Sequence, residues 1–420
     1  MQKYRKFAKF TILIELIIIT MEVVKIGVLR ETKVPPDHRV ALPPQRVLEL
    51  KSLLPNVEIL VQPSSLRCYK DEEYTQLGIT LQEDLSDCDM LIGVKEVDIP
   101  ALIPDKTYLF FAHVAKEQPY NRKLLQAFLE KRIRMIDYEY LTDPTGIRLI
   151  AFGRWAGIVG AYNGLRGLGV KSGNFQLKPA HECHDRQEMD AQLDKVVLNN
   201  ARILVSGGGR VAQGAMETLQ KLGIREVSPE SYSSDVFSEP VFCRIDPWHY
   251  VERNDNLDFD LQHFFKNPND YHSIALQYLH KTDLYIAAHY WDPDSPRFFE
   301  LNDLAPNNSG LNVMGTKFYA PNVIADISCD INGSVPTTTH ATTIADPFYY
   351  YDNILMMTVD NLPGELPRDA SDEFSDVLVK EILPRLILND PEKVIERASI
   401  TANGELTKIF SYLENYSKGL

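Results

Sequence analysis

The chain has 420 residues, 44% hydrophobic and 24% charged, a composition typical of a soluble globular protein and a length that predicts two or three domains. It carries 44 Lys and Arg against 58 Asp and Glu, and the net charge of −14 argues against nucleic acid or an anionic membrane surface as a partner. Five cysteines, an odd number with no Cys-x-x-Cys pair, indicate free thiols in a reducing compartment, so we expect a cytoplasmic protein.

The first 20 residues form a basic segment that continues into the apolar run Phe10–Thr20. A signal peptide is one interpretation, but Glu15 interrupts the run and no small-x-small cleavage site follows. The run is also short for a membrane span. Because Met21 stands directly before the strand-like "EVVKIGVLRE", we predict that residues 1–20 are an N-terminal extension outside the folded domains.

From there on, apolar strand-like runs alternate with helical patterns, which predicts an α/β fold with parallel sheets. Two polar segments, Leu177–Asn200 and Ser228–Asn267, are predicted to be rich in loops. The predicted strands are Val24–Leu29, Val57–Val61, Met90–Val94, Tyr108–Ala112, Met135–Tyr138, Ile203–Ser206, Asp283–Ala288 and Val323–Ile327. The predicted helices are Pro44–Leu53, Asn121–Lys131, Gly153–Leu168, Val211–Leu222 and Ser371–Ile387.

Lysine and histidine follow two successive predicted strands. "MLIGVKEV" ends in Lys95-Glu96, and "YLFFAHVAKEQ" ends in His113, with Lys116 three residues further on. A single such residue is usually a solvated surface group, but two successive strand ends favour a site, because ligands bind at the carboxyl ends of parallel strands. A crowded lysine can act as a base and a histidine can move protons near neutral pH.

A glycine turn lies in the middle of the chain, in "ARILVSGGGRVAQGAMETLQKLGI". A strand, a turn of Gly207, Gly208 and Gly209, and an amphipathic helix form the pattern that holds a dinucleotide pyrophosphate. Taken alone, the motif fits a glycine-rich connection without a ligand equally well. If it holds a cofactor, we expect a dinucleotide-binding domain at 154–344 and a substrate domain made of 21–153 plus 345–420. The fold is then two Rossmann-like domains with parallel sheets and a cofactor cleft between them.

A short polar segment, "PAHECHDRQEM", brings His181, Cys183, His184 and Asp185 together. A metal site is one interpretation, but zinc sites draw a second ligand cluster from elsewhere in the chain, and none is visible at a characteristic spacing. We therefore expect an interdomain loop and no metal.

Several longer segments carry a resemblance to a known family. They are "KIGVLRETKVPPDHRVALPPQRV", "LIGVKEV", "FFAHVAKEQPYNRKLLQAFLEKRIRMIDYEYLTDPTGIRLIAFGRWAGIVGAYNGLRGLG", "ILVSGGGRVAQGA", "ADISCDINGS" and "DNLPGELPRDASDEFS". They resemble the alanine dehydrogenase/transhydrogenase superfamily, and within it the saccharopine dehydrogenase family with its lysine–ketoglutarate reductase branch. The resemblance runs from about Val24 to about Ile387.

The resemblance implies a site for an amino-acid substrate. Lys95 and His113 correspond to the family's acid–base pair, and Glu139 tunes both of them. Asp330 lies at the nicotinamide side. The substrate-binding residues that it implies are Arg39, Lys116 and Arg148.

The resemblance also implies NAD as the cofactor. A carboxylate about 20 residues past a glycine turn normally binds the ribose hydroxyls, and Glu230 is the best-placed one, although Arg225 nearby complicates the choice. Two departures are clear: the family's first loop glycine is Ser206 here and its loop cysteine is Val211, so the loop disulfide of the fungal enzymes cannot form. The expected cofactor-binding residues are Gly207, Gly208, Gly209, Arg210, Val211, Glu230, Ala287, Ala288 and Asp326.

Three functions stay open at this point. The first is saccharopine dehydrogenase-like oxidation of an amino-acid C–N bond, giving lysine and 2-oxoglutarate from saccharopine. The second is an alanine dehydrogenase-like reaction on a small primary amino acid, against which "AHVAKEQPYN" and "LPRDAS" argue. The third is a catalytically idle homologue that binds a nucleotide, against which the presence of Lys95, His113 and Asp330 argues.

Overall fold

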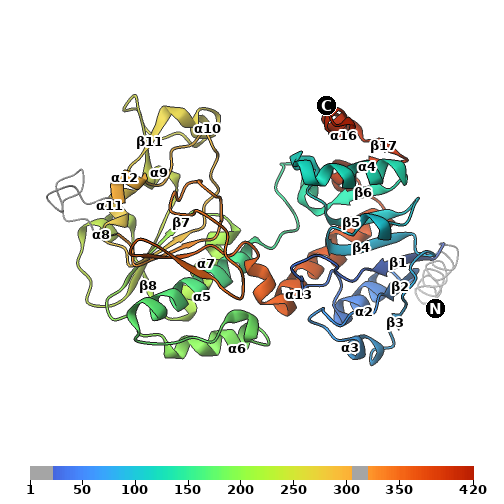
Figure 1. Ribbon diagram of the computed structural model, residues 1–420, viewed down its shortest axis with the longest axis horizontal. Coiled ribbons are helices and arrows are strands. Elements are labelled where there is room, and N and C mark those ends of the chain that lie inside the picture. The colour runs from blue at the N-terminus through green and yellow to red at the C-terminus, as the bar shows by residue number, and fades with distance from the viewer. Residues whose placement is uncertain (1–21, 305–319) are drawn as a thin grey trace, which may run out of the picture. The chain divides into compact units, whose positions relative to one another are not determined.

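The computed structural model describes residues 22–304 and 320–420, so the predicted extension at 1–20 lies outside the described residues. The chain forms two compact units. The first is made of Met1–Ala151 and Pro367–Leu420, and the second is the continuous segment Phe152–Leu366 (Figure 1).

The first unit is built on an eight-stranded sheet in the order β17-β16-β6-β5-β4-β1-β2-β3. The six strands from β6 to β3 are mutually parallel, and β16 and β17 join the β6 edge in antiparallel fashion. The strands are β1 (Val24–Val28), β2 (Val57–Val61), β3 (Thr80–Leu81), β4 (Met90–Lys95), β5 (Thr107–Phe111), β6 (Arg134–Asp137), β16 (Ser399–Ala402) and β17 (Glu405–Leu406). The helices are α2 (Pro44–Leu53), α3 (Asp71–Thr75), α4 (Arg122–Glu130), α13 (Pro367–Val377), α14 (Leu383–Ile387), α15 (Val394–Ala398) and α16 (Glu414–Lys418).

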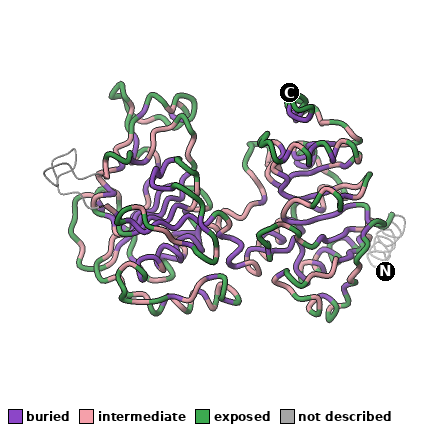
Figure 2. Tube along the Cα trace, viewed as in Figure 1, coloured by how far each residue is buried: buried purple, intermediate pink, exposed green. Residues whose placement is uncertain are grey.

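Buried strands form the centre of this sheet (Figure 2). Its central strands are nearly continuous apolar runs, as expected for parallel strands covered on both faces. Helix α13, which carries the "LPRDAS" motif, fastens the loop after β1. The Ser371 hydroxyl accepts the backbone N–H of Val40 at 3.0 Å, and Ser375 donates to the carbonyl of Ala41 at 2.6 Å. Helix α13 thus holds Val40 and Ala41 in place.

The second unit has a seven-stranded sheet in the order β14-β15-β13-β12-β7-β9-β8, parallel except for the β14 edge. A separate hairpin pairs β10 with β11. The strands are β7 (Arg202–Ser206), β8 (Arg225–Glu226), β9 (Val241–Ile245), β10 (Val251–Arg253), β11 (Tyr271–Ser273), β12 (Leu284–Ala287), β13 (Val323–Asp326), β14 (Phe348–Tyr351) and β15 (Ile354–Met357). The helices are α5 (Gly153–Ser172), α6 (Arg186–Ala191), α7 (Arg210–Lys221), α8 (Pro229–Ser234), α9 (Pro247–Tyr250), α10 (Leu261–Lys266), α11 (Leu276–Leu279) and α12 (Leu301–Leu304).

Helices α5 and α7 pack unusually closely, and glycine makes this possible. A Cβ atom on Gly157 of α5 would lie 1.8 Å from the carbonyl oxygen of Val211. A Cβ atom on Gly214 of α7 would lie 2.0 Å from the carbonyl oxygen of Arg154. The two backbones therefore touch, and this contact fixes the direction of α7 and of the glycine turn that begins it.

The predicted α/β class with parallel sheets is confirmed by these two sheets. The prediction that Ser228–Asn267 is rich in loops is wrong, because this segment contains strands β9 and β10 and helices α8, α9 and α10, and β9 lies between β7 and β8 in the second sheet. Residues 345–366, assigned from the sequence to the first domain, lie in the second unit, since β14 and β15 extend its sheet beyond β13. No helix among the described residues is long and apolar enough to span a bilayer.

Candidate active site

The carboxyl ends of β4, β5 and β6 bring three predicted residues to one edge of the first sheet. Lys95 is the last residue of β4 and pairs with Phe111 of β5, and His113 follows two residues later. Glu139 comes directly after β6, which lies on the other side of β5. These strands are parallel, so their carboxyl ends share one edge, the edge at which α/β proteins bind ligands.

Glu139 is the centre of this cluster, since three basic side chains approach its carboxylate. His113 Nδ1 lies 3.4 Å from Glu139 Oε2, and Lys116 Nζ lies 3.3 Å from the same oxygen. Arg148 Nη2 lies 2.9 Å from Oε1. Burial works to raise the pKa of Glu139, but the hydrogen bond with His113 and the charges of Lys116 and Arg148 outweigh it and lower this pKa to about 2. The carboxylate is therefore ionised throughout the neutral range.

Asp137, the last residue of β6, was not among the predicted site residues and holds the backbone of the cluster. Its fully buried carboxylate accepts the backbone N–H groups of Ala112, His113 and Glu139 at 3.1, 3.2 and 2.9 Å. His113 has a φ of 55°, in the left-handed region that a non-glycine residue adopts only under constraint. The Asp137 carboxylate supplies that constraint, although burial raises its pKa to about 6.

Lys95 lies in a less hydrated environment than the other cations of the cluster. Burial, and after it the nearby positive charge of Arg39, lower its pKa from the usual lysine value. Its backbone is fixed by Glu31, three residues after the end of β1. The Glu31 carboxylate accepts the N–H groups of Val94 and Lys95 at 2.7 and 2.8 Å. Burial raises the pKa of Glu31 to about 7. The sequence reading missed Glu31, although its position shortly after the first strand is a usable signal.

Arg39, predicted to bind a substrate carboxylate, forms a bidentate ion pair with Asp37 in this structure. Its Nε and Nη2 atoms lie 2.9 and 2.6 Å from the two Asp37 oxygens, and each residue is only 3% exposed. The pair depresses the pKa of Asp37 strongly against the effect of burial. In this structure, Arg39 therefore supplies a fixed positive charge near Lys95, while Lys116 and Arg148 lie closer to solvent.

The glycine turn of the second unit has the geometry of an anion-binding turn. Gly207 has a φ of +106°, and its backbone N–H donates to the carbonyl of Ile245 at 2.8 Å. Gly209 caps α7, and a Cβ atom there would meet nothing within 4 Å. The backbone at the start of this twelve-residue helix thus faces open space, where an anion is stabilised by the helix N-terminus. Arg210 and Val211 are the first two residues of the helix.

Several of the other predicted cofactor-binding residues lie at neighbouring strand ends in the same unit. Ala287 pairs in register with Ser206 on one side and with Asp326 on the other. Ala288 follows, and a Cβ on Gly207 would lie 2.8 Å from its carbonyl oxygen. The turn is backed by His289, which bridges the hydroxyls of Ser206 and Ser334 at 2.6 and 2.7 Å. Burial lowers the pKa of His289 to about 4, so it is a neutral structural link.

Asp326 and Asp330 have different surroundings. The buried Asp326 carboxylate accepts the hydroxyls of Ser328 and Thr338 at 2.7 and 2.6 Å and the N–H of Cys329 at 3.3 Å. It thus shapes the turn after β13. Asp330 lies at the exposed end of that turn.

Asp246, which was not among the predicted site residues, follows directly after β9, the strand beside β7. Strand β9 pairs with β7, whereas the short strand β8 pairs only with β9. Glu230 is exposed in α8, after β8. Asp246 Oδ1 accepts Arg244 Nη1 at 2.8 Å and would lie 2.6 Å from a Cβ on Gly208. A carboxylate close to the glycine turn therefore follows β9, a strand within the segment that was predicted to be rich in loops.

The His181–Asp185 segment does not gather metal ligands. His184 pairs with its neighbour Asp185 at 3.1 Å, and the buried Cys183 thiol donates to the carbonyl of Pro179 at 3.6 Å. Within residues 22–304 and 320–420, no group of three or more His, Cys, Asp or Glu side chains lies close enough to hold a metal ion. All five cysteines are free thiols.

Comparison with known proteins identifies the family. Residues 27–159 match the N-terminal domain of alanine dehydrogenase/PNT, and residues 316–408 match the C-terminal domain. The chain belongs to the alanine dehydrogenase/PNT family. The solved structure of an L-alanine dehydrogenase has the same fold, with a TM-score of 0.64 at 16% identity over 94% of this chain and 99% of that one.

Within the alanine dehydrogenase/PNT family, the chain is similar to proteins named alpha-aminoadipic semialdehyde synthase and saccharopine dehydrogenase. It is 30% identical to the mitochondrial alpha-aminoadipic semialdehyde synthase of Bos taurus over 90% of this chain, but it spans only 46% of that protein. It is 26% identical to the saccharopine dehydrogenase [NAD(+), L-lysine-forming] of Yarrowia lipolytica, over 92% of this chain and 98% of that protein. The predicted resemblance is confirmed.

Proposed function

We propose that this protein is an NAD-dependent dehydrogenase that oxidises the C–N bond of an amino acid, with saccharopine as the substrate. The observation that carries the proposal is the set of strand-end residues in the first unit, a poorly hydrated Lys95 beside a His113 that contacts the ionised Glu139. The name of the full-length fungal relative supports both the substrate and the cofactor.

The second unit fits a dinucleotide. The open space at Gly209, the positive φ of Gly207 and the helix that follows suit a pyrophosphate. Asp246 is the proposed ligand of the ribose hydroxyls in place of Glu230, because it ends the strand next to β7. Bound NAD+ supplies the hydride acceptor. Asp330 and the strand-end alanines, Ala287 and Ala288, are proposed to line the nicotinamide side.

The chain's own residues provide proton transfer and charge. Lys95, with its lowered pKa, accepts the proton of the substrate's secondary amine at Nζ as the α-carbon loses hydride and an imine forms. Water adds to the imine carbon, and His113 moves protons to and from the resulting carbinolamine, which separates into lysine and 2-oxoglutarate. Lys116 and Arg148 bind substrate carboxylates, for which a guanidinium offers two parallel hydrogen bonds. Glu139 holds these cations and His113 in place.

The test is NADH formation, followed by absorbance, with saccharopine and with alanine as alternative substrates. We expect turnover with saccharopine and little with alanine.

Lys95→Met and His113→Gln should each lower turnover roughly 10²–10⁴-fold with NADH binding nearly unchanged. The double variant should lose less than the product of the two, because both residues serve one proton path. Near-normal turnover of either single variant would contradict the assigned roles, and activity on alanine alone would contradict the substrate.

A further inference from the structure

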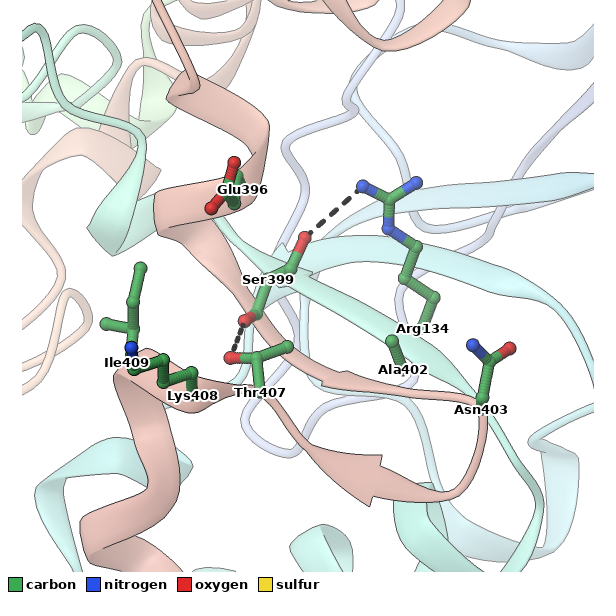
Figure 3. Close-up of a pocket in the computed structure, with 8 residues that line it drawn as sticks. All are labelled: Arg134, Glu396, Ser399, Ala402, Asn403, Thr407, Lys408 and Ile409. Atoms are coloured by element: carbon green, nitrogen blue, oxygen red, sulfur yellow. Dashed lines mark hydrogen bonds between the residues drawn. The ribbon is translucent and has the colours of Figure 1, made fainter.

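A cavity of about 580 Å³ lies in the first unit among β6, β16, α15 and the segment after β17 (Figure 3). None of the candidate active-site residues lines it. Its lining residues are Arg134, Glu396, Ser399, Ala402, Asn403, Thr407, Lys408 and Ile409. Strand β16 has a register shift between Ser399 and Thr401 where it pairs with β6, so the irregular edge of the sheet forms one wall of the cavity.

The cavity lies at the opposite end of β6 from the candidate active site. Arg134 is the first residue of β6 and Asp137 is the last, and three residue steps along a strand cover about 10 Å. Asp137 holds the backbone of His113 at the carboxyl end. The cavity therefore belongs to the amino ends of the parallel strands and is a separate place in the fold.

Arg134 is the notable group in this cavity, because it is half-buried and lacks an ion-pair partner among the residues that the structure describes. Its Nη2 donates to the Ser399 hydroxyl at a long 3.4 Å. Burial lowers its pKa, and the charge of Asp390 offsets this only in part. The Asp390 carboxylate itself accepts the backbone N–H groups of Val394 and Ile395 at 2.9 and 2.7 Å. A desolvated guanidinium without a counter-ion is costly, and an anion would remove that cost.

The other polar groups of the cavity suit an anion as well. The Ser399 hydroxyl donates to the carbonyl of Ile395 at 2.7 Å, which leaves its oxygen to accept from Arg134. Lys408 is exposed and forms no ion pair within the described part of the chain. Glu396 is the only carboxylate in the lining, and it pairs with Lys393 at 3.2 Å on the surface. Figure 3 shows the Arg134 guanidinium directed at the Ser399 hydroxyl.

We propose that this cavity binds a small oxyanion, the carboxylate or phosphate group of a metabolite, with Arg134 as its main partner and Lys408 as the second. The guanidinium offers paired donors to either group, and the lysine adds a second positive charge at the rim. The site is independent of the amino-acid site proposed above, since the two use different residues and different ends of the sheet.

The experiment is titration calorimetry of the full chain with inorganic phosphate and, separately, with succinate. We expect saturable binding of at least one of them, and which one binds identifies the preferred group. Arg134→Met should weaken this binding roughly tenfold or more, the loss expected for a charge-assisted pair. Lys408→Met should weaken it by a smaller factor, and because Lys408 is exposed, this variant tests the site even if Arg134→Met does not fold.

Two matched variants separate this site from others. Arg132→Met removes a neighbouring arginine that pairs with Asp105 at 3.0 Å outside the cavity, and Arg148→Met removes a cation of the candidate active site. Both should bind the anion as the unmodified chain does. Absence of saturable binding at millimolar concentration overturns the proposal. So does binding that is lost in Arg148→Met and kept in Arg134→Met and Lys408→Met. The calorimetric titrations with phosphate and with succinate do not depend on dehydrogenase activity.

Discussion

A single carboxylate, Glu139, organises most of the charge in the candidate active site. Its two oxygens contact His113, Lys116 and Arg148, and its side chain is only 16% exposed. A substrate carboxylate entering this cluster would share the same cations, so Glu139 also sets how strongly they bind a substrate. The residue is thus both a positioning group and a competitor for substrate charge.

Replacing Glu139 by Gln should destabilise the protein in a pH-dependent way. The folded pKa of about 2 lies below the usual value near 4.3, so ionised Glu139 stabilises the fold above about pH 4.3, and this contribution is lost as pH falls toward 2. We expect a loss of about 2–3 kcal/mol in unfolding free energy at pH 7. Urea denaturation of both proteins at pH 7 and pH 3.5 would measure it. An equal difference at both pH values would contradict the assignment.

Asp246 should determine whether the protein binds NADH more tightly than NADPH. A carboxylate at the end of the strand beside the glycine turn accepts hydrogen bonds from ribose hydroxyls and repels a 2′-phosphate. Asp246→Asn should therefore raise the ratio of NADPH to NADH affinity by roughly tenfold, helped by Arg244, which loses its charged partner. Nicotinamide fluorescence titration measures both affinities. Glu230→Gln, an exposed carboxylate in α8, is the control and should leave the ratio unchanged. The reverse result would restore Glu230 to the site.

At the scale of helices and strands, two glycines of the second unit have opposite roles. Gly157→Ala would force the α5 and α7 backbones apart, because its Cβ would lie 1.8 Å from a carbonyl oxygen. Gly209→Ala adds the same methyl group where nothing lies within 4 Å and where φ is −81°. We expect Gly157→Ala to cost about 3 kcal/mol or more of stability. Gly209→Ala should keep its stability and lose NADH affinity at least tenfold, since its methyl group fills the proposed pyrophosphate site.

Thermal unfolding and NADH titration of these two variants separate packing from binding. A Gly209→Ala variant that binds NADH normally would place the pyrophosphate elsewhere. A Gly157→Ala variant of normal stability would show that α5 and α7 can move apart without cost.

The helices and strands that could be predicted from the sequence are those with a clear apolar run or a clear helical spacing of apolar residues. Pro44–Leu53 and Val57–Val61 match α2 and β2 in the structure, and the other predicted strands agree within one or two residues at each end. Strand β9 was not predicted from the sequence, because "VFCRI" is short and lies between Pro240 and Pro247 in an acidic, aromatic segment. Its place beside β7 depends on long-range pairing, which local pattern does not encode.

The site was predictable to a similar extent. Lys95 and His113 stand out because polar residues end apolar runs. The pairing of Arg39 with Asp37 and the support of Lys95 by Glu31 depend on how loops fold back against the sheet. The missed Asp246 follows directly from the missed strand β9, because a residue can be placed at a strand end only when the strand itself is recognised.

At the scale of the whole molecule, the two units differ in how the chain builds them. The second is one continuous segment with its own sheet and core, whereas the first needs both ends of the chain. A fragment of residues 152–366 should therefore unfold cooperatively and bind NADH. Circular dichroism during heating and fluorescence titration would test this, with a fragment of residues 22–151 as the contrast, which should lack a cooperative transition. A fragment 152–366 that neither unfolds cooperatively nor binds NADH would contradict this expectation.

The antiparallel pairing of β16 with β6 has a consequence for the protein while it is being made. The ribosome delivers β6 before the second unit and β16 only after the whole of it. Until then the β6 edge exposes unpaired N–H and C=O groups, to which another nascent chain can add a strand. Slow or interrupted translation of the segment between β6 and β16 should therefore yield aggregates, and the first unit should depend more on chaperones than the second.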